Sequence, residues 1–375
     1  MESSKEAKKL SPFEEKLNKW VTDHLTFVSF VQKTLFVHHL QIMTKAGLSI
    51  VNSLQILSEE IENKKLRSLI ADVKNEVETG KQLSEALGKY PKIFPPIYVS
   101  MIAAGETSGK LEQSLEQIHD QMKKSQELTS RIRGALIYPA IVLTAMVGIA
   151  IEVVVFVLPK LMVMFKEFNA QLPLSTRILI KITEIGQLLF TTYVGPVVLV
   201  AGIILWILIK KIYNIPSVTR FMHLVYLRLP IAGPVLIKIS LARFTLTLSS
   251  LLESAIPIID AVKITSDVLG NVRYKENLAD AADGLKKGLP LSQILAKYRL
   301  TFPPMVTEMV MVGEETGQVE HMLSELSEYY SAEVDTTMRN FSTVIEPVII
   351  LVLGLAVAGI AVSVIMPMYS LAQQF

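Results

Sequence analysis

Carboxylate side chains recur at helical spacing between residues 112 and 120. Glu112, Glu116 and Asp120 stand four residues apart, which places them on one face of a helix. Glu62 ends an earlier stretch of helical spacing, and we expect it to face this stripe. Carboxylate oxygens are the ligands that calcium ions prefer, so Glu62, Glu116 and Asp120 form a candidate structural calcium site. A solvated acidic face is the alternative, and such a charge pattern favours it.

Other residue patterns that carry chemistry are incomplete. The sequence G-E-T-S-G-K-L at residues 105–111 approaches a phosphate-binding loop, but its second glycine comes one residue too early and no Ser or Thr follows Lys110. The six histidines include no H-E-x-x-H pair, and His38 and His39 are adjacent and therefore point to different sides of a helix. No Ser, His and Asp arrangement can be assigned from spacing. We therefore expect no enzymatic activity and no cofactor beyond the candidate calcium ion.

A long segment of the chain is duplicated. The stretch Phe94–Glu112 begins F-P-P and contains G-E-T-S-G, and Phe302–Glu320 repeats it with F-P-P and G-E-E-T-G. The same offset of 208 residues relates residue 36 to 244 and residue 159 to 367 without an insertion. A register kept over so long a stretch indicates an internal repeat of one structural unit.

The second copy of the repeat lacks key residues of both the candidate calcium site and the candidate phosphate-binding loop. In the second copy, the three candidate calcium ligands are replaced by Gly270, Ser324 and Glu328. A calcium site would therefore belong to the first copy alone. Gln318 takes the place of Lys110, so the second copy gives no support to a phosphate-binding role.

Each copy of the repeated stretch predicts two helices joined at a glycine-containing corner. Two prolines suit the first turn of the first helix, where a missing N–H donor costs nothing. We expect Gly105 to end that helix in a left-handed conformation and Ser108, or Thr316 in the second copy, to cap the next helix. We also expect the carboxylates of Glu106 and Glu314 to complement the N-terminal end of that next helix.

A corner present in both copies suggests a surface that contacts a partner. The candidate partner-binding residues are Gly105, Glu106, Gly109, Gly313, Glu314 and Gly317. The alternative is that each corner only connects two helices.

Helical spacing continues through both copies, and no sustained alternation predicts strands. In the first copy we expect one helix from residue 36 to about residue 46, followed by helices at about 49–61, 64–79 and 83–87. Gly47 and Gly80 are expected to end two of them. Each copy is therefore predicted to be a compact bundle of short helices.

The chain is too apolar for an ordinary soluble protein, with 50% hydrophobic residues and a mean hydropathy of +0.42 over 375 residues. The fold class is predicted to be all-α, as a polytopic membrane protein with two duplicated cytoplasmic helical bundles and three transmembrane helices. Pro159 and Pro367 are expected to end the first and third of these helices. The predicted segments are an N-terminal polar and amphipathic segment (1–35), the first bundle (36–134), three transmembrane helices (135–158, 188–209 and 343–367), an extracytoplasmic connector (159–187), the second bundle (210–342) and an extracytoplasmic tail (368–375).

Charge and composition predict the orientation in the membrane. No apolar segment occurs in the first ten residues, so we expect no signal peptide and a cytoplasmic N-terminus. Basic residues flank the proposed cytoplasmic ends of the spans, including Lys123, Lys124, Lys210 and Lys211. The net charge of only +2 gives no reason to expect direct nucleic-acid binding. The absence of cysteine excludes disulfides and thiolate metal sites.

With its duplicated F-P-P and G-E-x-[ST]-G motifs and three predicted spans, the chain resembles the type II secretion system protein F and type IV pilus assembly platform family. The resemblance covers about residues 36–375. It implies a bacterial inner-membrane platform that works with a cytoplasmic assembly ATPase, pilin or pseudopilin subunits and other inner-membrane assembly proteins, and that hydrolyses nothing itself. We expect the corners to form part of the contact with the ATPase. A homo-oligomer is also expected of a membrane scaffold.

A small membrane permease is the alternative function, because Glu152 is a charged residue inside the first predicted span. Large helical units and only three spans argue against it. The sequence leaves open whether the platform serves pilus assembly, protein secretion or DNA uptake.

Overall fold

The computed structural model describes residues 27–153, 215–230 and 232–372, together with a few isolated positions between them. These isolated positions are Phe156, Pro159, Lys181, Trp206, Lys210, Lys211 and Tyr213. Every regular element among the described residues is a helix, which confirms the all-α prediction. The second predicted span, residues 188–209, and most of the predicted connector lie outside the described residues, as do residues 1–26 and 373–375.

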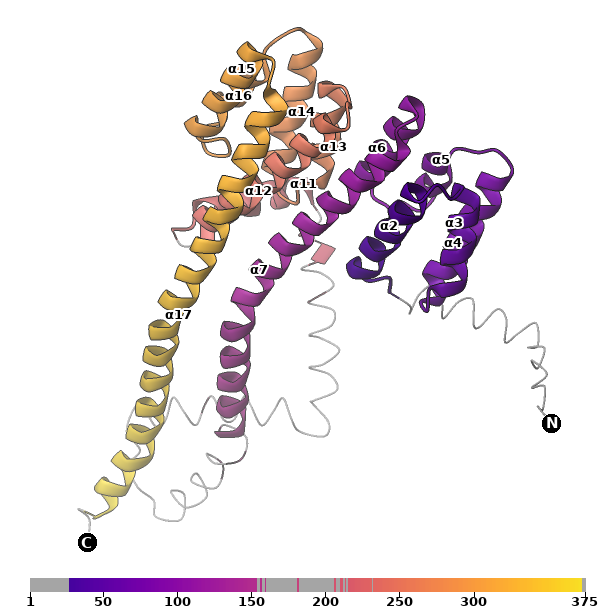
Figure 1. The fold of residues 1–375 in the computed structure, drawn as a ribbon. Helices are drawn as coiled ribbons and strands as arrows, with labels where there is room; N and C mark the ends of the chain where they lie inside the picture. The colour runs from indigo at the N-terminus through magenta and orange to yellow at the C-terminus, as the bar shows by residue number, and fades with distance from the viewer. Residues whose placement is uncertain are drawn as a thin grey trace, which may run out of the picture. The chain divides into compact units, whose positions relative to one another are not determined.

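The two copies of the repeat fold into the same series of helices (Figure 1). The first bundle consists of α2 (Phe30–Lys45), α3 (Ile50–Glu60), α4 (Lys64–Glu78), α5 (Leu83–Gly88), α6 (Pro96–Ser108) and the start of α7 (Leu111–Glu152). After α11 (Pro216–Arg228), the second bundle consists of α12 (Ala232–Glu253), α13 (Ile258–Val268), α14 (Val272–Lys286), α15 (Leu291–Leu295), α16 (Pro304–Thr316) and the start of α17 (Val319–Ala372). From α3 and α13 onward, each helix of the second bundle begins 208 residues after its counterpart.

Short polar residues and glycines set the ends of these helices, and the two glycines lie where the sequence predicts them. Ser49 caps α3 by accepting from the backbone N–H of Asn52, and Asn63 and Asn271 cap α4 and α14 in the same manner. Gly47 and Gly80 follow α2 and α4 with φ angles of 85° and 94°, a conformation that glycine adopts without strain.

The first helix begins earlier than predicted. Helix α2 starts at Phe30 instead of residue 36, because Ser29 and Gln32 form a capping box in which each side chain bonds the other residue's backbone N–H. Val28 is buried just before this cap. The end of the predicted N-terminal segment therefore belongs to the first bundle.

The phenylalanine of each F-P-P motif anchors a core. Phe94 is buried against Phe36, with ring centroids 5.6 Å apart. Its counterpart Phe302 lies 5.1 Å from Phe244 and also contacts Tyr274 edge to face. The two cores are therefore built on the same aromatic pair, and both cores lie in one compact unit that includes the described residues up to Thr129 and residues Ile237–Ser331.

Three helices among the described residues are long and apolar enough to cross a membrane, namely α7, α12 and α17. They differ in how much of the apolar segment the protein covers. In α12, 56% of that segment is buried, whereas in α7 and α17 only 6% and 7% is buried. The apolar surface of α12 is thus explained by the second core, while α7 and α17 leave rows of large apolar side chains uncovered, such as Ile141 and Leu355.

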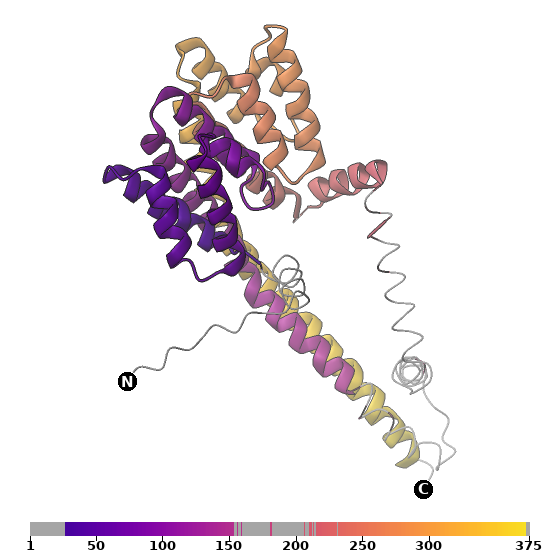
Figure 2. The ribbon, with the colours of Figure 1, turned by 90° about the vertical axis from the view of Figure 1, so that its right-hand side faces the viewer.

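Both of the uncovered apolar helices run on from a bundle without a break, as Figure 2 shows. Helix α7 contains Pro139 in its interior. Helix α17 continues past Pro367 to Ala372, so the prediction that this proline ends the helix is wrong. A proline removes one backbone donor but keeps a helical φ angle, so a long helix can pass through it.

Candidate partner-binding corners

Each corner is a single left-handed glycine between two helices. Gly109 has a φ angle of 69° and ends α6, and Gly317 has a φ angle of 70° and ends α16. The prediction that Gly105 ends the helix is therefore wrong, because Gly105 lies inside α6 and Gly313 lies inside α16. The local sequence offers two glycines four residues apart, and the later one makes the turn.

Gly105 and Gly313 instead allow the two helices of each corner to approach closely. A Cβ atom added at Gly105 would lie 2.4 Å from the Cβ atom of Ser114 on α7, and one added at Gly313 would lie 2.8 Å from the Cα atom of Val319. Ser114 fixes the approach further, since its buried hydroxyl donates to the carbonyl oxygen of Met101 at 2.5 Å. Both glycines are buried, so neither offers a surface to a partner.

The two corner glutamates bind the start of a different helix from the one predicted. The Glu106 carboxylate accepts from the backbone N–H groups of Leu83 at 2.5 Å and Ser84 at 3.1 Å, and also from the Ser84 hydroxyl. These N–H groups open α5, whose N-cap residue makes no side-chain hydrogen bond of its own. Glu106 therefore satisfies the donors of an upstream helix, and the prediction that it complements α7 is wrong.

Glu314 repeats this arrangement in the second bundle. Its carboxylate accepts from the backbone N–H groups of Leu291 at 2.5 Å and Ser292 at 3.1 Å, and from the Ser292 hydroxyl at 2.5 Å. An anion at a helix N-terminus is also favoured by the helix dipole. The same contact made twice shows that each corner is tied to the body of its bundle. A Leu-Ser pair kept at the same place in both copies was the sequence signal for it.

Ser108 and Thr316 do not cap the helices that follow them, contrary to the prediction. They end α6 and α16, and their hydroxyls donate back to the carbonyl oxygens of Ala104 and Val312, both at 2.8 Å. The exposed part of each corner is the turn itself, residues 107–110 and 315–318. In the first corner, Ser108 and Lys110 line a groove together with Glu253 and Ser254 of the second bundle.

The predicted calcium ligands do not form a site. Among the described residues, no three acidic or histidine side chains gather closely enough to hold a metal ion, and Glu62, Glu116 and Asp120 are all described. Glu116 instead lies 3.6 Å from the ammonium group of Lys45, and both side chains are about half exposed. The spacing of Glu116 and Asp120 along one helix predicts that they share a face. It carries no information on where Glu62, which comes from an earlier part of the chain, lies relative to them.

Two histidines pack together in the first bundle. The rings of His38 and His119 stack with centroids 4.2 Å apart, and the Nδ1 atoms of both are buried without a hydrogen-bond partner in the described structure. Burial lowers the pKa of His119, and the neighbouring His38 lowers it further. This is a packing role.

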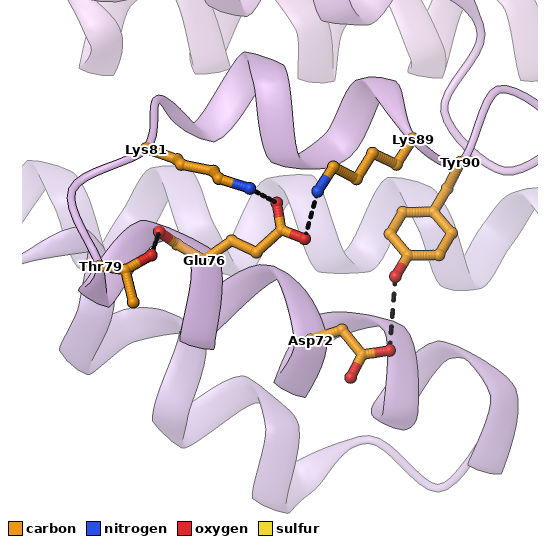
Figure 3. Close-up of polar contacts among 6 residues, drawn as sticks. All are labelled: Asp72, Glu76, Thr79, Lys81, Lys89 and Tyr90. Atoms are coloured by element: carbon orange, nitrogen blue, oxygen red, sulfur yellow. Dashed lines mark hydrogen bonds and ion pairs between the residues drawn. The ribbon is translucent and has the colours of Figure 1, made fainter.

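A surface cluster of charged residues ties α4 to the chain on both sides of α5 in the first bundle (Figure 3). Glu76 pairs with Lys89 at 2.5 Å and with Lys81 at 3.4 Å, and the hydrogen bond from Lys89 lowers the pKa of Glu76. Beside it, the Tyr90 hydroxyl donates to Asp72 at 3.4 Å. Burial raises the pKa of Tyr90, and the charge of Asp72 adds to this.

The second bundle keeps only part of this cluster. The Tyr298 hydroxyl donates to Asp280 at 2.7 Å, which repeats the pair of Tyr90 and Asp72. Gly284 and Leu289 stand at the places of Glu76 and Lys81. The tyrosine contact therefore belongs to the shared fold, whereas the ion pairs are particular to the first bundle.

Two copies of one helical bundle, each continued by an apolar helix, define a membrane protein built by internal duplication. The family model of the type II secretion system protein F matches residues 36–159 and again residues 244–367. These two matches coincide with the register read from the sequence. The chain belongs to the type II secretion system protein F family.

Relatives named for two kinds of machine are similar to this chain in sequence. The type IV pilus assembly protein PilC of Thermus thermophilus is 35% identical over 337 residues, which cover 90% of this chain and 82% of that protein. PilC of Myxococcus xanthus is 32% identical over 90% of this chain and 80% of its own length. The type II secretion system protein F of Aeromonas hydrophila is 31% identical over 90% of this chain and 85% of its own length.

Proposed function

We propose that this chain is the inner-membrane platform of a type IV pilus or type II secretion machine, and that it couples a cytoplasmic assembly ATPase to the movement of pilin or pseudopilin subunits. The observation that carries the proposal is the double family match, which includes both bundles and the apolar segments that follow them. Relatives similar over nine tenths of the chain carry the names of both machines. The chain itself hydrolyses no nucleotide in this proposal.

The long helices support a mechanical role. Helices α7 and α17 contain 42 and 54 residues, which at 1.5 Å per residue correspond to about 63 Å and about 81 Å. Each includes the last helix of a bundle and an apolar segment, with no loop between them. A displacement of the bundle is therefore transmitted along a stiff helix to the apolar segment. Two such bundles give the ATPase two places to act.

The proposal includes an orientation in the membrane. Three spans with a cytoplasmic N-terminus put both bundles on the cytoplasmic side, where an ATPase has access to them, and other inner-membrane assembly proteins contact the spans. Matching bundles in one compartment agree with their common origin. The permease alternative rests on Glu152, which is an exposed residue at the end of α7. This position alone does not define a binding site for a solute.

The contact of the corners with the ATPase stays a prediction. A residue that tests it must be exposed at a corner and must not hold another helix of the bundle. Glu106 and Glu314 hold neighbouring helices, so changing them alters the bundle as well as any contact. The exposed turn of the second corner offers Gln318. The variant Gln318→Arg adds bulk and charge there, and Asn75→Arg makes the same change at an exposed position on α4.

The first test of the proposal is a deletion strain that is complemented with the full chain. We expect loss of surface pili or of secreted protein on deletion and recovery on complementation, and the phenotype shows which machine the chain serves. In parallel, the detergent-solubilised chain should capture the host's assembly ATPase. Gln318→Arg should weaken capture while Asn75→Arg leaves it unchanged. A deletion that leaves both piliation and secretion normal would overturn the platform proposal, and equal capture by both variants would remove the second corner from the ATPase contact.

A further inference from the structure

The two bundles contact each other through faces that are not equivalent. The first bundle contributes its α6–α7 face, which includes Ala103, Ala104, Gln117 and Gln121. The second bundle contributes its α12–α13 face, which includes Ser250, Glu253, Ile256 and Ile264. Because the two bundles are copies of one unit, this is a heterologous contact between repeats. Each repeat therefore has one face in use and one face left over.

The contact is made of a few polar pairs and a groove that both apolar and polar side chains line. The Ser250 hydroxyl donates to the side-chain oxygen of Gln121 at 2.7 Å, and both residues are buried. The side-chain amide of Gln117 donates to the carbonyl oxygen of Glu253 at 3.3 Å. Ala103 and Ala104 line one groove with Ile256 and Ile264.

The offset of 208 residues identifies the two faces that remain. On the second bundle, the α16–α17 face carries Met311, Val312, Glu325 and Tyr329 at the places of Ala103, Ala104, Gln117 and Gln121. On the first bundle, the α2–α3 face carries Ile42, Lys45, Leu48 and Ile56 at the places of Ser250, Glu253, Ile256 and Ile264. Each of these two faces is the counterpart of a face that is already bound inside the chain.

Large apolar side chains on both remaining faces are exposed. Met311, Val312 and Tyr329 are 44%, 45% and 43% exposed on the α16–α17 face. Ile42 and Leu48 are 49% and 37% exposed on the α2–α3 face, whereas Ile256, the counterpart of Leu48, is only 7% exposed in the contact inside the chain. Exposed apolar groups gathered on one face mark an interaction surface.

The residues on the two remaining faces complement each other pair by pair. The hydrogen-bonded pair of Gln121 and Ser250 corresponds to Tyr329 and Ile42, so both members change from polar to apolar together. Gln117 and Glu253 line one pocket in the contact inside the chain, and their counterparts Glu325 and Lys45 carry opposite charges. A surface that only faces water has no need for such matched changes.

The alanines that line the groove also have larger apolar counterparts on the α16–α17 face. Ala103 and Ala104 opposite Ile256 and Ile264 correspond to Met311 and Val312 opposite Leu48 and Ile56, so larger apolar groups meet apolar groups. Lys45 lies near Glu116 of its own bundle at 3.6 Å, with more than half of its side chain exposed, and its ammonium group remains accessible to a second carboxylate.

We propose that the α16–α17 face of one copy binds the α2–α3 face of a second copy of this chain, in the geometry of the contact between its own two bundles. The resulting assembly is head to tail. Every copy then presents the same two faces to its neighbours, and only closure into a ring uses all of them. This inference concerns the chain alone and does not rest on the proposed coupling to an ATPase.

Cross-linking tests the proposal directly, because the chain contains no cysteine. The variant Ile42→Cys and the variant Tyr329→Cys are expressed together as full chains with different tags, and native membranes are treated with a short bis-maleimide. We expect a cross-linked dimer that carries both tags, and little product when either variant is expressed alone. The double variant should give a ladder of products that ends at the number of copies in the ring. Gln121→Cys with Ser250→Cys should cross-link within one chain, which provides the positive control.

A charge exchange separates a specific contact from damage to the fold. Glu325→Lys or Lys45→Glu, placed in the double-cysteine chain, should lower the cross-linked fraction by about fivefold through like-charge contact. The two changes together should restore it. The proposal is overturned if a single cysteine variant cross-links to itself as well as to the other, since that indicates a two-fold contact. It is also overturned if no ladder forms while the positive control does, or if the charge exchange does not restore cross-linking.

Discussion

Glu106 in the first bundle and Glu314 in the second make the same three hydrogen bonds to the helix that lies upstream of them. The buried glycines, the turn glycines and the paired phenylalanines are also common to both bundles. The faces that meet a neighbour differ, since the buried pair of Gln121 and Ser250 has the exposed residues Tyr329 and Ile42 as its counterparts. The duplicated unit therefore kept its internal supports and changed where it meets a neighbour.

The largest effect is expected at the buried glycine of the first corner. Gly105→Ala places a Cβ atom 2.4 Å from the Cβ atom of Ser114, which is held by its own hydrogen bond. The helices must separate, and the free energy of unfolding of the first bundle should fall by about 3 kcal/mol. Hydrogen exchange measured by mass spectrometry on the full chain in detergent resolves the two bundles and should show lost protection in the first.

Gly270→Ala is the matched control for that substitution. No atom lies within 4 Å of a Cβ atom added at Gly270, and the first repeat already carries a side chain there, in Glu62. Protection should stay unchanged in this variant. Equal protection in Gly105→Ala and Gly270→Ala would show that the corner helices are not packed as closely as the structure has them.

A smaller effect is expected when the corner carboxylate becomes an amide. Glu106→Gln keeps one acceptor oxygen but turns a donor group toward donors at the start of α5, which should cost about 2 kcal/mol. Glu314→Gln should cost the second bundle a similar amount, because its distances of 2.5 Å and 3.1 Å are the same. Exchange of the amide protons of Ser84 and Ser292 measures the two losses separately. Unequal losses would mean that the corners are supported differently despite the shared geometry.

Much of the fold follows from local sequence, because caps and helical spacing act within a few residues. Ser49, Asn63 and Gly80 set helix ends where the sequence predicts them, and the repeat period predicts the second bundle from the first. The role of Glu106 does not follow from local rules of helix ends, since its partner Ser84 lies 22 residues upstream, and only a comparison of the two copies points to it. The contact of Gln121 with Ser250 spans 129 residues, and periodicity carries no signal for it.

The smallest effect concerns a pair of residues that only the first bundle has. His38 stacks on His119, whereas the second repeat carries Leu246 and Ser327 at these places. Burial and the neighbouring ring lower the pKa of His119, Lys123 lowers it further, and Asp120 and the Thr34 backbone oppose this. The unfolded chain therefore takes up a proton first, near pH 6.5 for a free histidine. The first bundle should lose stability as the pH falls below that value, down to the lowered pKa of the folded state.

Replacing His119 with serine, the residue of the second repeat, tests whether this one histidine causes the acid sensitivity of the first bundle. His119→Ser removes the titrating group, so the first bundle of this variant should show a weaker loss of exchange protection between pH 7 and pH 5. The second bundle of the same molecules provides the internal reference, since it lacks both rings. A variant whose first bundle kept the full acid sensitivity would place the titration elsewhere in that bundle, and the stacked histidines would then affect packing but not proton uptake.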